Sequence, residues 1–174
     1  RGLGDVYKRQ VNAGSITSIT GSLSDLLTAY GSNGITGLGN EAITVSDTSS
    51  LAASDLNSLD SKTSGLITLD TSLATLTGTV AELNTAYGSS GLSIDGDEAI
   101  TISDTTVDAE ALNVLNNYTS GVINADALTK LTGALVDVNA SFAADALASG
   151  ATISGLGDQD VELTDTNILA ADLN

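Results

Sequence analysis

The chain has 174 residues, of which 41% are hydrophobic and only 3% aromatic, and its 22 acidic against 5 basic residues give a net charge of −17. Such an acidic excess argues against nucleic-acid binding, because phosphate contacts need clustered Lys and Arg, and against docking on anionic membranes. The sequence holds no Cys and no His, which excludes disulfides, thiolate or imidazole metal sites and a histidine base. No apolar run reaches the roughly 18 residues of a membrane span. We therefore expect neither nucleic-acid binding nor membrane insertion.

Residues 1–10, RGLGDVYKRQ, differ from the rest of the chain because they hold three of its five basic residues. Read back into codons, they resemble the translated end of a sequencing adaptor. We therefore expect a non-native tail and leave residues 1–10 out of the fold. The chain also has no Met, so we expect a fragment of a longer reading frame, whose signal peptide or anchor would lie outside this sequence.

Three copies of one pattern run through the remaining residues. A trio ending in Thr-Gly occurs at 19–21, 76–78 and 131–133, and an acidic segment follows it each time. The acidic segments read NEAITVSDT at 40–48, DEAITISDT at 97–105 and DQDVELTDT at 158–166. The sequence therefore predicts one continuous repeat array. Its units are residues 11–71, residues 72–126 and an incomplete third unit at residues 127–174.

The first predicted element of each unit is a helix. Apolar residues step by 3 and 4 positions along residues 16–30, 73–87 and 128–142, which is the spacing of one helical face. A Gly inside each stripe costs about 1 kcal/mol relative to Ala in a helix interior, so the helix either runs through the stripe or begins after the Gly. Ser22 with Asp25 resembles a capping box just after this Gly.

A short strand comes next. In residues 42–47, Ile43 and Val45 alternate with small polar residues, and the same alternation returns around residues 100–102 and 161–163. Alternation with a period of two is typical of a half-buried strand.

A second helix follows each of these strands, and a Thr directly after the strand is expected to cap it. The expected caps are Thr48, Thr105 and Thr166. A Thr-Ser-Gly motif ends the helix at Gly65 or Gly121, and a further β-like segment follows at residues 66–69 or 122–125. Each unit is therefore predicted as strand–helix–strand–helix.

Short strands separated by helices favour parallel pairing, and such crossover connections are nearly always right-handed. A unit of about 57 residues with so few aromatic side chains buries little by itself, so neighbouring repeats complete its core. We therefore expect an α/β fold, a right-handed solenoid with a parallel sheet. The alternative is a parallel β-helix with helical excursions.

The repeated AITISDT segment, with the later Leu-Asn, TSG and LTG motifs, resembles repeats of giant bacterial cell-surface and adhesin-like proteins of the marine cyanobacterial type. The resemblance covers residues 11–174, and its motifs are structural. It implies a secreted or cell-surface protein, with a role as spacer, adhesin or surface coat. The partners expected from it are neighbouring repeats of the same chain and ligands at the cell surface or in the environment.

Catalysis finds little support in the sequence. A Ser or Thr nucleophile needs a nearby base, and without His only Lys62, Lys130 or a carboxylate could serve. Neither Lys lies in an S-x-x-K context. An active site also needs a unique pocket, whereas a repeat protein repeats its surface. We therefore expect no enzyme and no resident organic cofactor.

Calcium is the one specific ligand that the residues suggest. Acidic residues gather around the Gly-containing loop and strand of the second unit and in the matching region of the third, and oxygen-rich loops suit Ca²⁺. The candidate ligands are Asp95, Asp97, Glu98, Asp104, Asp158, Asp160 and Asp165; Asn40, Glu41 and Asp47 match them in the first unit. The alternative interpretation is a solvated acidic rim that keeps the protein dispersed.

Two function classes therefore stand, a structural spacer or interaction segment and a calcium-dependent adhesive module. A more distant alternative is binding to ice or another flat surface. Its candidate residues are the hydroxyl side chains at outward strand positions, Thr44, Ser46, Thr101 and Ser103; in the third copy, Asp160 and Glu162 interrupt the pattern.

Overall fold

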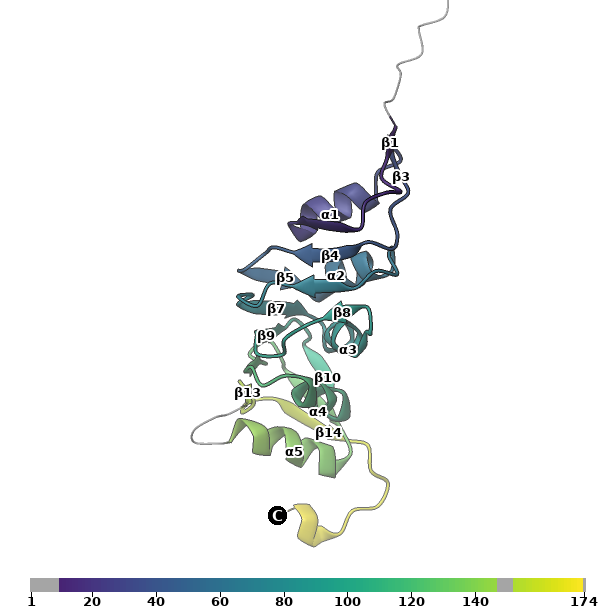
Figure 1. Ribbon diagram of the computed structural model, residues 1–174. Coiled ribbons are helices and arrows are strands. Elements are labelled where there is room, and N and C mark those ends of the chain that lie inside the picture. Colours follow the sequence, from purple (N-terminus) through teal and green to yellow (C-terminus); the bar gives the residue numbers. More distant parts are fainter. Residues whose placement is uncertain (1–9, 147–151, 174) are drawn as a thin grey trace, which may run out of the picture.

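The computed structural model describes residues 10–146 and 152–173. Within these residues the chain forms five α-helices and short strands that pair only in parallel (Figure 1). The predicted α/β class with parallel pairing is therefore confirmed. None of the helices in this part is long and apolar enough to cross a membrane. The predicted tail lies outside the described residues, apart from Gln10.

The helices follow one another at regular intervals along the chain. They are α1 (Leu23–Tyr30), α2 (Ala53–Asp60), α3 (Val80–Gly88), α4 (Ala109–Tyr118) and α5 (Leu135–Asp145), followed by a short 3₁₀ helix, η1 (Ala170–Leu173). Each α-helix packs on the next one in the sequence, so the five form a single column (Figure 1).

The strands form four separate sheets within the described residues. The first pairs β1 (Val11–Asn12) with β3 (Ile35–Thr36). The second has the order β2 (Ser18–Gly21), β4 (Ala42–Val45), β6 (Ile67–Leu69) and β8 (Leu92–Ser93). The third has the order β5 (Ser50–Ala52), β7 (Thr75–Gly78), β9 (Ala99–Ile102), β11 (Ile123–Asn124) and β13 (Ile153–Ser154). The fourth has the order β10 (Thr106–Asp108), β12 (Lys130–Gly133) and β14 (Asp160–Leu163).

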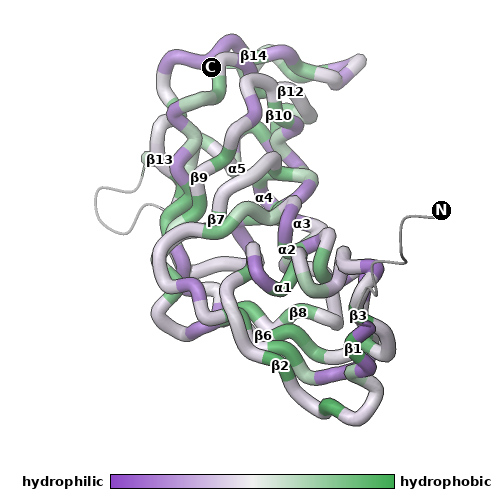
Figure 2. Tube along the Cα trace, turned by 90° about the horizontal axis from the view of Figure 1, so that it is seen from above, coloured by the Kyte–Doolittle hydropathy of each residue, from purple (hydrophilic) through white to green (hydrophobic). Residues whose placement is uncertain are grey.

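The number of strands between successive helices alternates. Three strands separate α1 from α2 and α3 from α4, whereas two separate α2 from α3 and α4 from α5. The last strand of each group of three, β5 or β10, is the first strand of a new sheet, the third or the fourth. Figure 2 shows the result: the strand groups β2–β6–β8, β7–β9 and β10–β12–β14 occupy successive places, while the helices keep to one line.

One face of the sheets is buried beneath the helices and the other is exposed. On β4, Ile43 and Val45 are buried, whereas Ala42 and Thr44 are exposed. Ile100 and Ile102 on β9 are buried in the same way. The helices contribute mainly Leu and Ala to a single apolar cluster with these strand residues. The predicted half-buried alternation is therefore confirmed for β4 and β9. In the third copy the strand forms as β14, but Val161 is exposed and Leu163 is only half-buried, so the predicted burial is wrong there.

The helix predicted through each apolar stripe is wrong in its first half. Residues 18–21, 75–78 and 130–133 are strands, and each helix begins after the Gly. Gly78 and Gly133 have φ values of 157° and 148°, far from helical geometry. The predicted break after the Gly is confirmed, since the Ser22 side chain caps α1 and Thr79 with Glu82 forms a capping box on α3.

The predicted caps Thr48 and Thr105 of the second helix are also wrong, and after Thr166 the described residues form only η1. A further strand, β5 or β10, lies between the Thr and the helix, so Ala52 and Asp108 occupy the N-cap positions of α2 and α4. Thr48 and Thr105 instead accept backbone hydrogen bonds through their carbonyl oxygens from the strand region of the following unit.

Candidate functional site

Three acidic residues of the repeated segments bind a backbone N–H at the start of a preceding helix. Asp104 Oδ2 accepts a hydrogen bond of 2.7 Å from the N–H of Val80, the first residue of α3. Asp47 binds the first residue of α1 and Asp165 binds that of α5, each at 2.7 Å. The first N–H groups of a helix have no partner within the helix, and negative charge is favourable there. Asp104 and Asp165, two of the predicted calcium ligands, therefore act as helix caps.

Glu98, another predicted ligand, is only 3% exposed. Its carboxylate accepts hydrogen bonds from the Gly96 N–H at 3.0 Å and from the Tyr87 hydroxyl at 3.2 Å. Glu41 has the same place in the first unit, is 1% exposed and accepts from the Tyr30 hydroxyl at 2.7 Å. These two carboxylates hold their own loops against the preceding helix, because the tyrosines lie at the ends of α3 and α1.

The surroundings of Glu41 change the pKa of both partners. Burial alone would raise the pKa of the Glu41 carboxyl, but hydrogen bonds from the N–H groups of Gly39 and Asn40 and from Tyr30 outweigh it and hold the pKa below its ordinary value. Burial and the Glu41 carboxylate raise the pKa of Tyr30 to about 12. The pair is therefore a carboxylate and a neutral phenol at pH 7.

The third unit replaces both members of this pair. Phe142 stands where the first two units have Tyr, and Gln159 stands where they have Glu. Gln159 Oε1 accepts from the Gly157 N–H, and its Nε2 donates to the Leu128 and Gly155 carbonyl oxygens. The third loop thus keeps its backbone hydrogen bond through a neutral amide, which needs no phenol partner.

The remaining predicted calcium ligands, Asp95, Asp97, Asp158 and Asp160, are exposed. Within residues 10–146 and 152–173, no three carboxylates converge into a group that could hold a metal ion. Calcium binding stays a prediction, and the geometry of the described residues gives every buried or capping acid a partner within the chain.

A row of asparagines joins consecutive helices, and sequence reasoning did not assign it this role. The Nδ2 atoms of Asn57, Asn84 and Asn113 donate to backbone carbonyl oxygens of the next helix, those of Glu82, Ala111 and Asp137, at 2.9 to 3.0 Å. The signal in the sequence is the Leu-Asn pair that recurs in these helices. Each bond joins one helix to a backbone carbonyl oxygen near the start of the next helix, so neighbouring helices are held in the same relative position.

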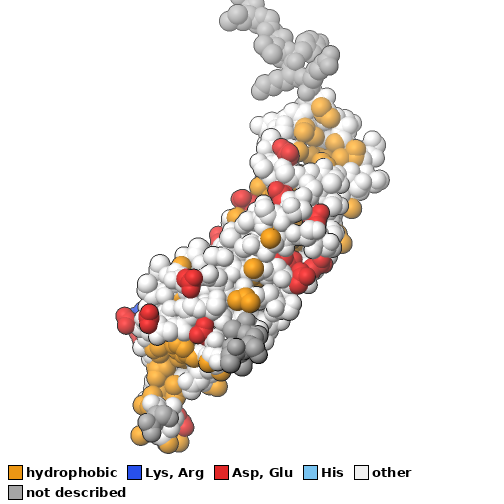
Figure 3. Space-filling view, turned by 90° about the vertical axis from the view of Figure 1, so that its left-hand side faces the viewer, with side chains coloured by type: hydrophobic (Ala, Val, Ile, Leu, Met, Phe, Trp, Pro, Cys, Tyr) orange, Lys and Arg blue, Asp and Glu red, His pale blue; other side chains and the backbone are white. Residues whose placement is uncertain are grey.

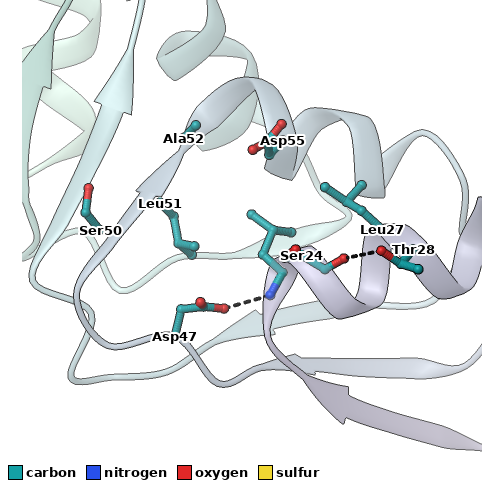
Figure 4. A pocket seen from close by; sticks show the side chains of 9 residues that line it. Ser24, Leu27, Thr28, Asp47, Ser50, Leu51, Ala52 and Asp55 are labelled. Atoms are coloured by element: carbon teal, nitrogen blue, oxygen red, sulfur yellow. Dashed lines mark hydrogen bonds between the residues drawn. The ribbon is translucent and has the colours of Figure 1, made fainter.

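The contact between α1 and α2 lacks this asparagine, because Leu27 takes the position of Asn84. A groove of about 460 Å³ opens here, lined by residues of α1, of β5 and of the first turn of α2 (Figure 4). Asp47 and Asp55 are its charged groups; Asp47 is committed to the cap of α1. The lining offers hydrogen-bond acceptors and hydroxyls but no base paired with a nucleophile.

The outward strand positions bear small hydroxyl side chains. Register places Thr20, Thr44, Thr68 and Ser93 side by side across β2, β4, β6 and β8. Thr44 is exposed, as are Ser46, Thr101 and Ser103. The geometry is a narrow row of hydroxyls, and ice or surface binding by it stays a prediction.

No protein-family model matches this chain, and the comparisons with curated proteins and with solved structures gave no match. The inference of function therefore depends on the contacts within the chain and on the resemblance of its repeats.

Proposed function

We propose that this chain is a stretch of a right-handed α/β solenoid, which serves as a spacer or interaction segment of a large secreted or cell-surface protein. The observation that carries the proposal is the regular interval in the sequence between residues that pair on neighbouring strands. Every pairing joins a residue to one 23 to 30 positions later, from Ile100 with Ile123 to Lys130 with Asp160. A chain that returns beside itself at this interval, with one helix in each return, advances along an axis.

The contacts between units support a structural role. The same aspartate cap and the same asparagine bond recur from unit to unit. Stability in such an array comes from each unit and its nearest neighbour. The right hand of the proposed solenoid rests on the general preference of parallel crossover connections.

The surface agrees with a spacer that stays dispersed. Figure 3 shows acidic side chains scattered along one whole face with almost no basic ones, and the net charge is −17. Like charge keeps neighbouring molecules apart. The extracellular or cell-surface location rests on the resemblance of the repeats alone.

Small-angle X-ray scattering tests the proposal. We would compare the chain with a version in which residues 72–126 are duplicated in frame. A solenoid keeps its cross-section and lengthens by about 10 Å if the two added strand spacings set the rise, or about 20 Å if the two added helix spacings do. An increase in the cross-sectional radius at constant length would overturn the proposal.

Thermal melts in chelator, CaCl₂ and MgCl₂ at equal ionic strength decide between a spacer and a calcium-dependent module. A spacer responds equally to both salts, because they only screen its charge. A calcium ion that binds the folded state alone stabilises it by about 2.7 kcal/mol at a hundredfold excess over Kd. A rise in Tm specific to calcium would therefore favour the adhesive module.

A further inference from the structure

The strand β5 has one open edge inside the array. Its one ladder partner is β7, so no strand lies on its other side within the described residues. In the next repeat β10 has the same place and pairs only with β12, although described helices and strands lie both before and after it. The open edge therefore arises where the array adds a strand, and not at either end of the chain.

The direction of the backbone groups shows which of them face this edge. The Leu51 carbonyl oxygen faces β7, because it accepts a hydrogen bond of 3.2 Å from the Thr77 hydroxyl of that strand. Successive residues of a strand direct their N–H and C=O groups to opposite sides. The N–H and C=O of Ser50 and the N–H of Ala52 therefore face away from β7, where no strand of the described chain pairs with them.

This edge forms one wall of the groove of about 460 Å³ between α1 and α2 (Figure 4). All three residues of β5, Ser50–Ala52, line the groove, and Leu23 and Leu27 line it on the α1 side. Leu23 and Leu51 are buried, and Leu27 is partly buried and packs against the core. The groove therefore combines an apolar floor with an open strand edge.

Two polar side chains close the matching contact between α3 and α4. Asn84 donates to the Ala111 carbonyl oxygen at 3.0 Å, and Asp108, the N-cap of α4, accepts from the Ala111 N–H at 3.2 Å. Leu27 and Ala52 take these two positions in the first repeat, and α2 has no side-chain cap. The first N–H groups of α2, which have no acceptor within the helix, therefore add donors to the open edge of β5.

Both charged groups of the groove are negative. Asp55 lies on the first turn of α2 and is exposed. Asp47 uses its Oδ2 atom to cap α1. Neither carboxylate forms an ion pair within residues 10–146 and 152–173. An acidic ligand is therefore repelled here, whereas a Lys or Arg side chain is attracted.

An extended peptide fits these features better than a single ion does. The open edge and the start of α2 offer both donors and acceptors, and a peptide backbone supplies the partners of both kinds. Alternate side chains of an extended segment point to opposite sides. An apolar side chain can therefore cover the leucines of the floor while a neighbouring Lys or Arg reaches Asp55.

We propose that the groove between α1 and α2 binds an extended, Lys- or Arg-bearing peptide segment of another protein, which adds to the open edge of β5 as a further strand. The site depends only on the contact between the first two helices, so it does not rest on the proposed solenoid. It adds to the role of a spacer one defined place at which a partner is held.

NMR titration of the full ¹⁵N-labelled chain tests this with the capped peptide Ac-KTLTK-amide. The centre of the peptide copies Thr75–Thr77, the part of β7 that pairs with β5 on its other side. The amide signals of Ser50 and Ala52 should shift in a saturable way, with a Kd below about 1 mM. Those of Thr106 and Asp108 on β10 should not shift, because the contact between α3 and α4 is closed.

Two control peptides separate the effect of charge from that of backbone pairing. Ac-ETLTE-amide reverses the charge and should give no saturable shift. Ac-KTPTK-amide keeps the charge, but Pro has no backbone N–H and is excluded from central strands. It should bind about three- to tenfold more weakly, as the loss of one hydrogen bond implies. Added salt should weaken the binding of the first peptide, because it screens the attraction to the carboxylates.

Three variants of the chain locate the site. Leu27→Asn should close the groove, because Asn at this position of α3 bonds to the following helix, and binding should fall at least about tenfold while the other amide signals keep their places. Asp55→Asn should weaken binding about two- to fivefold, as expected for one exposed ion pair. Glu110→Gln is the matched control, because it removes an exposed acid from the first turn of α4; it should leave the Kd unchanged.

The proposal is overturned if Ac-KTLTK-amide gives no saturable shift of Ser50 and Ala52 up to about 5 mM, or if Ac-ETLTE-amide binds as well. Full binding by Leu27→Asn would contradict it, as would equal effects of Asp55→Asn and Glu110→Gln. The scattering test measures the chain without peptide, so a groove that binds nothing does not bear on the solenoid, and a failed solenoid does not bear on the groove.

Discussion

Replacement of Asp104 by Ala should destabilise the fold through α3. The Asp104 carboxylate is 2.7 Å from the Val80 N–H at the first residue of that helix. Loss of a side-chain cap costs about 0.5–2 kcal/mol, typically about 1, and loss of a negative charge near the helix N-terminus costs about 0.3–1 kcal/mol more. Val80 is only 4% exposed, so water replaces the lost acceptor poorly. We expect a total of about 1.5 kcal/mol, which lowers the Tm of a chain of this size by about 3–6 °C.

Differential scanning calorimetry measures this difference, and two further variants identify its cause. Asp104→Asn keeps a carbonyl acceptor but not the charge, so its Tm should lie between those of Asp104→Ala and the parent. Asp97→Ala removes an exposed carboxylate seven positions earlier in the same repeated segment and should leave the Tm within about 2 °C, because surface changes usually stay within ±0.5 kcal/mol.

The two roles considered for Asp104, helix cap and calcium ligand, predict different responses to calcium. A cap contributes equally in chelator and in CaCl₂, whereas a ligand contributes only when calcium is bound. The reasoning is refuted if Asp104→Ala melts with the parent in chelator, or if Asp97→Ala costs as much as Asp104→Ala.

Three further predictions concern the loops and the helix contacts. Because the folded-state pKa of the Glu41 carboxyl is lowered, its contribution is present above its unfolded pKa of about 4.3 and disappears as the pH falls through the folded-state pKa. Glu41→Gln should therefore be less stable than the parent at pH 6, and urea titrations should show the difference shrinking below about pH 4; a constant difference down to pH 2 would contradict this. Asn113→Ala removes the bond from α4 to α5 and should cost about 1–3 kcal/mol in urea unfolding, whereas Asn139→Ala, at an exposed position of α5, should cost under about 0.5 kcal/mol; equal losses would argue against the asparagine row. Gly121→Ala would place a Cβ into the Glu98 carbonyl oxygen, whereas nothing lies within 4 Å of the same atom at Gly157. Chemical denaturation should show a cost of at least about 1–3 kcal/mol for the first and a near-parental midpoint for Gly157→Ala.

Local pattern was enough to predict the strands β4 and β9 and to give the start of α3 after the Gly as one of two alternatives. Ile43 and Val45 alternate with small residues, and a strand is the simplest structure that buries only every second side chain. Thr79 and Glu82 are three positions apart after a Gly, and both partners of that capping box lie within one turn of the chain. Such signals need no knowledge of the neighbouring units.

The remaining features depend on contacts between units, which no local pattern contains. β10 is a strand because it pairs with β12, 24 residues later, so Thr105 was mistaken for the cap of a helix that begins further on. The sequence suggests Asp104 as a calcium ligand because nothing near it in the chain shows that its partner is the Val80 N–H, 24 residues earlier. Glu98 carries a charge, which argues for exposure, and its burial follows only from the loop N–H and phenol that bind it.

The alternation of two and three strands between helices has a consequence for how such a chain can gain or lose length. Removal of a single helix with its strands would bring two units of the same kind together, so strands would meet partners displaced by one place in the sheet. Removal or duplication of one whole sequence repeat of about 57 residues, which holds two helices with their strands, leaves every remaining strand its partner. Recombination between repeats can therefore shorten or extend the chain by whole sequence repeats and keep its strand pairing. A change of half a repeat would leave strands next to partners of the wrong kind.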